Sequence, residues 1–243
     1  MAYNSASTIS ETLRSVSAQT HPDIEHIVID GGSSDDTCRL VRLYGDKVRV
    51  FVSEPDKGIY DAMNKGLARA TGDVVGFLNS DDCYLSGDVL SRVAQMLAQD
   101  DALDAVMGDV EFFDPARPHR SVRRYRSDRF RPGLLAWGWM PAHPALFVRR
   151  RVFEQAGNFR TDFRIAGDFE WVVRAFARST RRFRHLDAVL VRMRSGGVST
   201  GGWRSTLLLN QEVLRACRDN GIRTNWLKIL SKYPAKMLEF ARP

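Results

Sequence analysis

Strand and helix patterns alternate along the first half of this chain, and that alternation restricts the possible folds more than any other feature. Short apolar or alternating runs at residues 26–30, 48–52 and 73–79 predict strands. Apolar residues recur at helical spacing before and between these runs, as in residues 9–16 and 62–70. We therefore expect an α/β fold in which a mainly parallel sheet carries helices on both faces.

The second half of the chain has a less regular pattern. We expect strands at residues 104–113, 143–148 and 184–194, and helices at residues 168–179 and 204–220. Residues 117–132 are rich in Arg and Pro, which predicts an excursion or mobile loop. With 243 residues, the chain has room for one large α/β domain, or for one domain with a small appendage.

Composition excludes several other classes of protein. Hydrophobic residues make up 44% and charged residues 27%, which excludes a disordered or fibrous chain. No apolar run is long enough to predict a transmembrane helix, and the first residues show no secretory signal. Cys38, Cys83 and Cys217 are far apart and odd in number, so we expect reduced thiols in the cytoplasm rather than disulfides or a zinc site.

Charge is distributed unevenly between the two halves. Residues 1–110 contain 9 Lys and Arg against 18 Asp and Glu, whereas residues 111–243 contain 27 against 11. The net charge of +7 therefore combines an acidic half with a basic half. A basic half is compatible with nucleic acid, anionic lipid or phosphorylated ligands, and also with a plain solvated face.

Two polar clusters follow predicted strands, at the sheet edge where such folds bind ligands. Residues 30–33 (Asp-Gly-Gly-Ser) allow close backbone approach, and the Asp can accept a hydrogen bond from a base or a ribose. Residues 79–82 (Asn-Ser-Asp-Asp) provide carboxylates that, together with a phosphate, suit Mg²⁺ or Mn²⁺. Taken alone, each cluster is also compatible with an ordinary turn or a helix cap.

A third polar cluster spans residues 54–66, at the start of a predicted helix. Helix N-termini bind anions, and Lys57 and Lys65 are close enough in sequence to reach a phosphate there. Taken alone, this segment is also compatible with a solvated helix start. The chain has no G-x-G-x-x-G fingerprint, so a dinucleotide fold gains little support, and the missing G-x-x-x-x-G-K-[ST] motif argues against a P-loop.

The order of several motifs resembles one known family. Bacterial family 2 nucleotide-sugar glycosyltransferases, above all the subgroup that builds surface polysaccharides and glycolipids, are similar in the strings Tyr3-Asn4, VIDGGSSDDT, SEPDKGIYDAMNKGLARATGD, FLNSDD, HPALFVRR and IAGDFEW. The resemblance covers roughly residues 1–200. It implies a Rossmann-like GT-A fold with a mixed, mainly parallel sheet, a divalent metal, and inversion at the anomeric carbon.

Residue by residue, the resemblance implies a role for positions in every cluster. Asp168 resembles the catalytic base, which takes a proton from the acceptor hydroxyl, and Asp81 and Asp82 stand at the site of a Mn²⁺ or Mg²⁺ ion that offsets charge on the leaving diphosphate. The positions that resemble the site of the nucleoside-diphosphate sugar are Tyr3, Asn4, Asp30, Gly32, Lys57, Asp61, Asn64, Lys65, Asn79, Ser80 and Arg194. His143 is interpreted either as facing the acceptor or as a core histidine.

Two features depart from the family pattern. Asn79 stands where many members have an Asp, which weakens a metal contact and leaves open a nucleotide-sugar-binding module without catalysis. Members usually begin with an apolar strand before the Tyr-Asn pair, whereas Met1 stands where that strand should end. Its loss would expose the neighbouring ladders, so we hypothesise that the native start lies upstream or that the chain is a truncated product.

We expect a glycosyltransferase domain at residues 1–203 and a helical extension at residues 204–243. Within the domain, residues 1–110 form the nucleotide-sugar half and residues 111–203 the acceptor and catalytic half. The acceptor is expected to be a glycan or a lipid-linked hydroxyl.

The basic half, with its apolar and Lys-rich tail, is expected to approach the inner face of the plasma membrane, and ordinary packing of the tail is the open alternative. No nucleic-acid partner is expected, because the Arg cluster at residues 117–131 carries no recognised motif. A sugar-nucleotide-forming nucleotidyltransferase is the remaining alternative on a similar sheet, but no Gly-rich, Arg-containing loop lies near the start.

Overall fold

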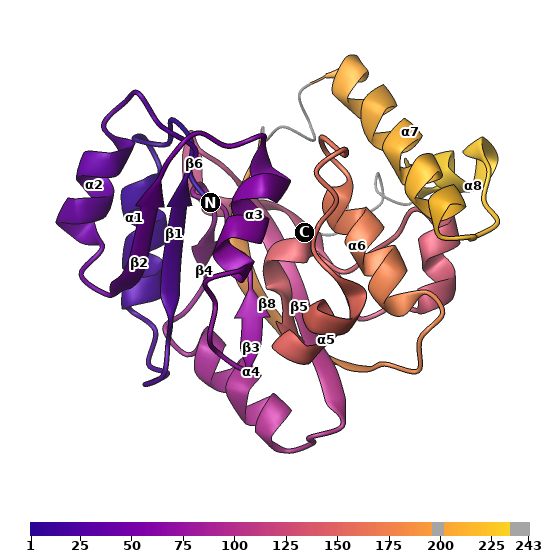
Figure 1. Ribbon diagram of the computed structural model, residues 1–243, viewed down its shortest axis with the longest axis horizontal. Helices are drawn as coiled ribbons and strands as arrows, with labels where there is room; N and C mark the ends of the chain where they lie inside the picture. Colours follow the sequence, from indigo (N-terminus) through magenta and orange to yellow (C-terminus); the bar gives the residue numbers. More distant parts are fainter. Residues whose placement is uncertain (196–201, 234–243) are drawn as a thin grey trace.

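The computed structural model describes residues 1–195 and 202–233, and alternating helices and strands form its amino-terminal part (Figure 1). This part comprises α1 (Ile9–Ser17), β1 (His26–Asp30), α2 (Thr37–Tyr44), β2 (Val48–Ser53) and α3 (Ile59–Leu67). The middle comprises β3 (Val74–Gly76), β4 (Cys83–Tyr84), α4 (Val89–Ala98), β5 (Leu103–Asp114), β6 (Arg117–Tyr125) and two 3₁₀ segments, η1 (Pro132–Trp137) and η2 (His143–Ala145). The last part comprises β7 (Leu146–Arg149), α5 (Arg150–Ala156), α6 (Gly167–Phe176), β8 (Arg182–Arg194), α7 (Trp203–Asp219) and α8 (Trp226–Leu230).

The strands form two sheets. β1 and β2 pair in parallel, while a six-stranded sheet has the order β3-β7-β5-β8-β4, with β6 added beside β5. Within the described residues, only β1–β2 and β5–β8 pair in parallel, and the other four pairings are antiparallel. The α/β class and the mixed sheet are confirmed, but the predicted excess of parallel pairs is wrong. The reason is that β7 and then β6 both run against β5, while β8 follows it in parallel.

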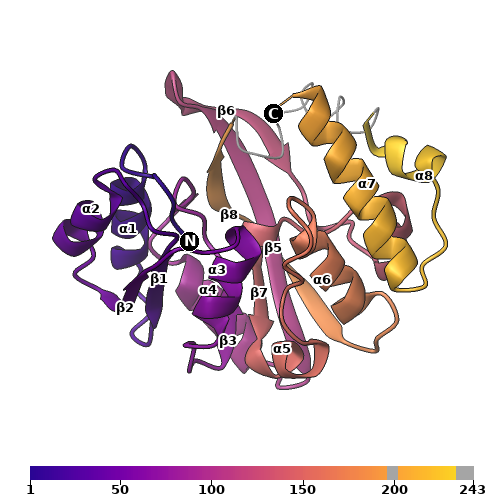
Figure 2. The same cartoon turned by 45° about the horizontal axis from the view of Figure 1, so that its top comes forward.

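β5 and β6 form a hairpin where the sequence predicted a loop at residues 117–132. Val110 pairs with Tyr125, and Figure 2 shows the hairpin projecting beyond the body of the molecule. The Arg124 guanidinium donates to the fully buried Asp109 carboxylate at 2.7 Å, which ties the two strands together. The Arg-rich sequence misled the prediction because Arg side chains on an exposed strand can extend into solvent or find a carboxylate on the neighbouring strand.

Two other predicted strands are shorter in the structure. Residues 73–79 contribute only β3, and the chain then leaves the sheet at Phe77, whose ring stacks on His143 with 5.6 Å between centroids. The strand predicted at residues 143–148 begins with η2, where Pro144 suits the tight turn but cannot donate to a ladder. Aromatic packing and proline therefore shorten both strands.

The main core lies between the six-stranded sheet and helices α5, α6 and α7. Trp171 and Phe176 of α6 are almost fully buried, and the Trp171 ring stacks on Phe153 at 4.2 Å between centroids. Val213 and Cys217 of α7 belong to the same cluster. α7 thus packs into one core with elements that precede residue 203. The structure describes the predicted helical extension up to residue 233, and residues 234–243 lie outside the described residues.

All three cysteines are free, as predicted. Burial raises the pKa of Cys83 and that of Cys217 to about 11, so both thiols stay protonated at neutral pH. In the part of the chain that the structure describes, no helix is long and apolar enough to cross a membrane.

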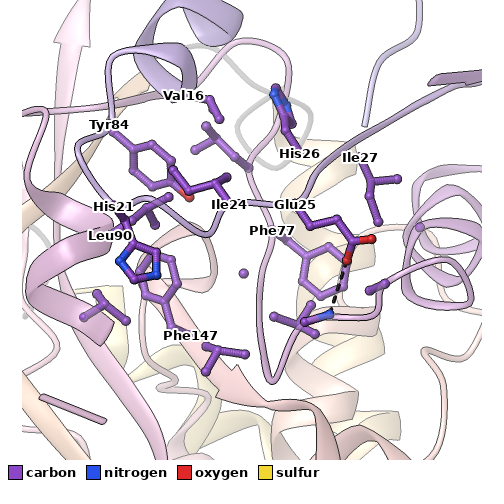
Figure 3. A pocket seen from close by; sticks show the side chains of 18 of the residues that line it. Val16, His21, Ile24, Glu25, His26, Ile27, Phe77, Tyr84, Leu90 and Phe147 are labelled. Carbon is purple, nitrogen blue, oxygen red and sulfur yellow. Dashed lines mark hydrogen bonds between the residues drawn. The ribbon is translucent and has the colours of Figure 1, made fainter. Parts of the chain in front are cut away.

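A cavity of about 570 Å³ lies between β1 and β3 (Figure 3). Among the described strands, β1 pairs only with β2, and β3 pairs only with β7. Each of β1 and β3 therefore has one unpaired edge, and this edge lines the cavity. The chain start lies at this cavity, where Ala2 pairs in parallel with Asp30 and the Met1 ammonium donates to Leu78 O at 3.3 Å. The apolar side chains that line the cavity include Val16, Phe77, Tyr84, Leu90 and Phe147.

Candidate functional site

Three loops meet at the carboxyl ends of β1 and β2. The Ala2 N–H donates to Ile29 O at 2.8 Å, and the Gly31 N–H donates to Ala2 O at 2.9 Å. Directly after β2, the Glu54 N–H donates to Asp30 O at 3.0 Å. The chain start, the loop after β1 and the loop after β2 are thereby held at one sheet edge, where the sequence predicted a ligand site.

Asp30 is fully buried beneath this edge, and its carboxylate accepts several hydrogen bonds from the protein itself. The donors are the Gly32 N–H at 3.1 Å, the Ser33 N–H at 3.0 Å, the Ser33 hydroxyl, the Ser53 hydroxyl at 2.7 Å and the Cys38 thiol at 3.3 Å. Burial raises the pKa of Asp30, but the bonds from Ser33, Ser53 and Cys38 outweigh burial and hold that pKa below its ordinary value. Asp30 thus orders its own loop, and Gly32 lies within that loop.

Tyr3 and Asn4 border the same loop. Asn4 has a φ of 46°, a conformation that Asn tolerates better than most residues. Its N–H donates to Ser33 Oγ at 2.8 Å, and its Oδ1 accepts from the Ser34 N–H at 2.9 Å. Tyr3 is 64% exposed, so its ring offers an open face to a flat ligand.

The loop at residues 79–82 holds two aspartates in different surroundings. Asp82 is buried, and its Oδ2 accepts from Asn79 Nδ2 at 3.0 Å. Burial, and then the charge of Asp81, raise the pKa of Asp82 to about 7, against the effect of the Asn79 bond. Asp81 is half-buried, and Ser80 Oγ lies 2.7 Å from Ser5 Oγ, which ties this loop to the chain start.

Asn79 presents a buried oxygen that no described residue satisfies. Its Oδ1 accepts no hydrogen bond within residues 1–195 and 202–233. Mg²⁺ and Mn²⁺ prefer oxygen ligands, and Mg²⁺ commonly takes one or two from protein and others from a substrate phosphate. Asn79 and Asp81 fit such a shared ion, whereas the Asp82 carboxylate faces into the protein. The described residues contain no cluster of three or more His, Cys, Asp or Glu that could hold a metal.

Asn64 of α3 joins the two halves of the molecule. Its Nδ2 donates to Phe159 O and its Oδ1 accepts from the Phe159 N–H, both at 2.9 Å. Since both amide atoms are engaged, the side chain serves this junction in the structure, although the resemblance assigned it to the donor.

The other predicted residues around α3 form a charged group at its start. Lys65 Nζ lies 2.9 Å from Glu54 Oε1 and 3.7 Å from Asp61 Oδ2. The hydrogen bond to Glu54 is the main cause that raises the pKa of Lys65. Asp61 Oδ2 also accepts from the Lys57 N–H at 3.0 Å. The Lys57 side chain itself is exposed in the loop between β2 and α3.

Asp168 lies at the start of α6 and is fixed by a residue of α3. Its Oδ1 accepts from the Phe169 N–H at 2.8 Å and from the Tyr60 hydroxyl at 3.2 Å. The single proton of the Tyr60 hydroxyl is shared with Ile165 O at 2.6 Å, and a Cβ on Gly167 would lie 2.7 Å from the Tyr60 ring. Only glycine therefore allows this close approach, which sets the position of Asp168 relative to α3.

An aromatic cluster connects Asp168 with the segment before residues 79–82. The Phe77 ring meets Phe159 edge-on at 5.2 Å, and Tyr60 lies 6.1 Å from Phe159. His143 stacks on Phe77, and burial lowers its pKa while the charge of Asp168 acts in the opposite direction. His143 is therefore a packed aromatic side chain that also feels the field of Asp168.

Arg194 reaches the site because β8 pairs with β4, directly after residues 79–82. Its Nη2 lies 3.5 Å from Glu11 Oε2, and its guanidinium lies 5.5 Å from the centre of the Phe113 ring. Its Nε is buried and has no hydrogen-bond partner in the described part of the chain. The rest of the segment predicted to close over the diphosphate, residues 196–199, lies outside the described residues.

Glu212 is a buried residue of α7 that the sequence reading missed. One carboxylate oxygen accepts from the Arg164 N–H at 2.8 Å, and the other accepts from the Ile165 and Ala166 N–H groups at 2.9 and 2.8 Å. It thereby satisfies the loop that leads into Asp168. The sequence does contain a signal for this residue. Glu212 stands at an apolar position of the helical pattern, between Leu209 and Val213, which indicates a buried and paired carboxylate.

Residues 1–157 match the family described as "Glycosyl transferase family 2". This stretch contains the three loops at the sheet edge, all of α3 and residues 79–82. The chain belongs to glycosyltransferase family 2. The resemblance found in the sequence is thereby confirmed, and it places this family member among the transferases.

Curated members of the family cover most of this chain. The PGL/p-HBAD biosynthesis glycosyltransferase of Mycobacterium tuberculosis (strain H37Rv) is 30% identical over 200 residues, which are 81% of this chain and 75% of that relative. Glycosyltransferase AglE of Haloferax volcanii is 29% identical over 182 residues, 71% of this chain and 58% of that protein.

Solved glycosyltransferases of GT-A fold superpose on nearly the whole chain. Staphylococcus aureus TarS 1-349 in complex with UDP has a TM-score of 0.65 at 20% identity, over 99% of this chain and 70% of that one. Mannosyltransferase PcManGT of Pyrobaculum calidifontis, in complex with GDP-Man and Mn²⁺, has a TM-score of 0.69 at 23% identity, over 98% and 68%. This chain spans 43% of a longer TarS chain. At these identities the likeness establishes the fold.

Proposed function

We propose that this family member transfers a sugar from a nucleoside-diphosphate sugar to an acceptor hydroxyl in a single inverting displacement. The observation that carries the proposal is the position of Asp168, which Tyr60 ties to α3 at 3.2 Å. α3 begins beside the predicted donor edge, so the carboxylate stands between the donor half and the acceptor half. The complexes of TarS with UDP and PcManGT with GDP-Man support a nucleotide-sugar donor for this fold.

Asp168 acts as the general base. The acceptor hydroxyl gives its proton to the Asp168 carboxylate while its oxygen attacks the anomeric carbon, and the bond to the diphosphate breaks. The Phe169 N–H and the Tyr60 hydroxyl hold Oδ1 in place. Burial, and then the charge of Asp168, raise the pKa of Tyr60, so its phenol remains protonated and keeps donating.

The leaving diphosphate belongs at residues 79–82. Asn79 Oδ1 and Asp81 would hold a Mg²⁺ or Mn²⁺ ion, which when bound offsets the charge that develops on the diphosphate. The Mn²⁺ in the PcManGT complex supports this choice. Lys57 and Arg194 are the two cations besides Lys65 that the resemblance assigns to the donor, and they would complete the electrostatic environment of the diphosphate.

A release assay tests this function. The chain is incubated with Mn²⁺ and a panel of UDP-, GDP- and dTDP-sugars, and the free nucleoside diphosphate is measured. We expect release from one donor, and its loss in Asp81→Ala. Asp73→Ala, an aspartate before β3, is the matched control and should release normally. Donor-dependent release that Asp81→Ala leaves unchanged would contradict the metal role.

For the acceptor, we propose a glycan or lipid-linked hydroxyl at a membrane surface. The PGL/p-HBAD relative supports glycolipid synthesis. On this chain, Trp203 is 73% and Leu227 is 82% exposed on α7 and α8, and Lys228 Nζ lies 5.5 Å from the Trp137 ring centre. Exposed Trp and Leu beside Lys are typical of a surface that lies against anionic lipid headgroups.

Vesicle flotation tests the membrane contact. We expect the chain to float with vesicles that contain anionic lipid, and Leu227→Ser to reduce the floated fraction. Leu43→Ser is the matched control, because Leu43 is 59% exposed on α2, in the acidic half. Equal flotation of both variants and the parent chain would contradict a membrane contact through this surface.

A nucleotide-sugar-binding module without catalysis is the second candidate. Asn79 in place of an Asp favours it, because the site then holds one fewer negative charge for a metal. The release assay separates the two functions, since a pure binder retains affinity for the donor but frees no nucleoside diphosphate.

A further inference from the structure

The loop after β2 holds a carboxylate that the proposed chemistry does not use. Asp56 is half-buried, and its Oδ1 accepts from the Gly58 N–H at 2.8 Å. Gly58 has a φ of 110°, a conformation that favours glycine, so this turn is built around the Asp56 side chain. Gly58 thus allows Asp56 to take a fixed orientation.

The Asp56 carboxylate lies against Gly31, at the end of β1. A Cβ added to Gly31 would collide with Asp56 Oδ2 and would lie 3.1 Å from Asp56 Cγ. Position 31 therefore has no side chain of its own, and the space beside its Cα is filled by a carboxylate from a loop 25 residues further along the chain. The Gly31 N–H bonds to Ala2 O, directly before the exposed Tyr3. Asp56 and Tyr3 accordingly border the same backbone position.

Asp30, which the resemblance assigned to the nucleobase, cannot take that role in this geometry. Its side chain is not exposed, and five donors from the protein already occupy its oxygens. By contrast, Asp56 has a fixed carboxylate at the edge, with one oxygen beside Gly31. Because Tyr3 and Asp56 both border residue 31, a base that stacks on Tyr3 would have Asp56, and not the enclosed Asp30, as its available carboxylate.

We propose that Asp56 recognises the base of the donor by accepting a hydrogen bond from its imide N–H, and that this selects uracil, thymine or guanine over cytosine and adenine. The proposal rests on the nucleotide-sugar site described under the proposed function. Uracil and thymine carry the imide proton at N3 and guanine at N1, whereas cytosine and adenine have only an acceptor at the corresponding ring nitrogen. A carboxylate accepts from the first group and repels the lone pair of the second.

The test compares nucleoside diphosphates by titration calorimetry with the full chain and Mn²⁺. We expect UDP, dTDP or GDP to bind at least about tenfold more tightly than CDP and ADP, as a hydrogen bond to a charged group allows. In Asp56→Ala this preference should fall to within about threefold, while the CDP affinity stays near that of the parent chain. Asp36→Ala, an exposed aspartate at the start of α2, is the matched control and should keep the preference.

A paired variant separates recognition from a structural role. In Gly31→Asp combined with Asp56→Gly, the carboxylate returns to the same space from the other loop, and the preference for imide bases should recover at least partly. A structural role would instead lower the UDP and CDP affinities together and would not be rescued. Equal losses, or an unchanged preference in Asp56→Ala, would overturn the proposal. A parent chain that binds none of the five nucleotides would overturn the proposed function itself.

Discussion

Asp168 is held by its own helix, by α3 and, through the preceding loop, by α7. Because Tyr60 and the Phe169 N–H position Oδ1, an amide at residue 168 keeps the shape of the site but cannot accept the proton. For Asp168→Asn we expect the turnover rate to fall by about 10²–10⁴-fold while donor affinity is unchanged. Asp162→Asn, in the loop that precedes α6, is the control. A comparable loss of turnover in both variants would contradict a role as base.

His26 makes the stability of the chain depend on pH. Burial, and then the charge of the amino terminus, lower the pKa of His26 to about 4, and its Nδ1 has no hydrogen-bond partner within the described residues. In the unfolded chain the imidazole takes a proton below about pH 6.5, whereas in the folded chain it stays neutral down to about pH 4. The unfolded state therefore binds more protons between these values, and the free energy of unfolding should fall as the pH drops through this window.

Urea denaturation at several pH values measures this dependence. We expect the contribution of His26 to approach about 1.4 kcal/mol per pH unit within the window, and His26→Gln to remove that part of the slope. His21→Gln, at a half-buried histidine that lines the cavity before β1, is the control. The same slope in His26→Gln and the parent chain would contradict a neutral, buried imidazole.

The sequence indicated which residues belong to the site, but it did not indicate which contacts their side chains make. The sequence placed Asp30 and Asn64 in the right segments, yet their hydrogen-bond partners, Ser53, Cys38 and Phe159, come from other parts of the chain. Glu212 was missed for the same reason, since its partners lie 46 to 48 residues away. No local pattern reports which donors a fold will bring to a buried carboxylate.

At the level of elements, α7 supports the loop that leads into Asp168. The Glu212 carboxylate satisfies three consecutive backbone N–H groups of this loop. In Glu212→Gln an amide NH₂ would face one of these donors, so we expect stability to fall by about 1–3 kcal/mol and turnover to fall with donor affinity kept. Thermal unfolding and steady-state kinetics measure both, with Glu154→Gln on the surface of α5 as the control. Full stability and activity in Glu212→Gln would contradict this support.

Two glycines test the packing of α3 and β3. A Cβ on Gly66 would meet Ile29 Cγ1 at an ordinary 3.6 Å, so Gly66→Ala should stabilise the chain by about 0.5–1 kcal/mol through the better helix propensity of Ala. A Cβ on Gly76 would lie 2.8 Å from the Phe147 ring, so Gly76→Ala should destabilise it by about 1–3 kcal/mol. Chemical denaturation that gives both changes the same sign would contradict the packing described.

Helices and strands with a clear local period were predicted well, as in α1, β1 and β2. The sequence did not predict which strands pair with one another. From its own residues, β6 was predicted to be an Arg-rich loop. It is a strand because its partner, β5, supplies the buried Asp109 and the hydrogen-bonded ladder. The excess of antiparallel pairs likewise depends on where β7 enters the sheet. The periodicity of the residues in β7 does not encode that position.

Across the whole molecule, the acidic half and the basic half meet at α3. The hydrogen bonds between the Asn64 side chain and the Phe159 backbone cross this junction, and so does the Tyr60–Asp168 contact. The donor loops and residues 79–82 lie in the acidic half, while Asp168, α7 and α8 lie in the basic half. Under the proposed function, the donor and the base would therefore lie on opposite sides of one junction, which is the arrangement that a single displacement requires.

The stereochemistry of the released sugar tests this account most directly. With Mn²⁺ and the donor found in the release assay, water can replace the acceptor, and proton NMR identifies the first anomer before mutarotation. We predict the anomer opposite to that in the donor, and no such signal in Asp168→Asn. Release of the same anomer as in the donor would contradict a single displacement with Asp168 as its base.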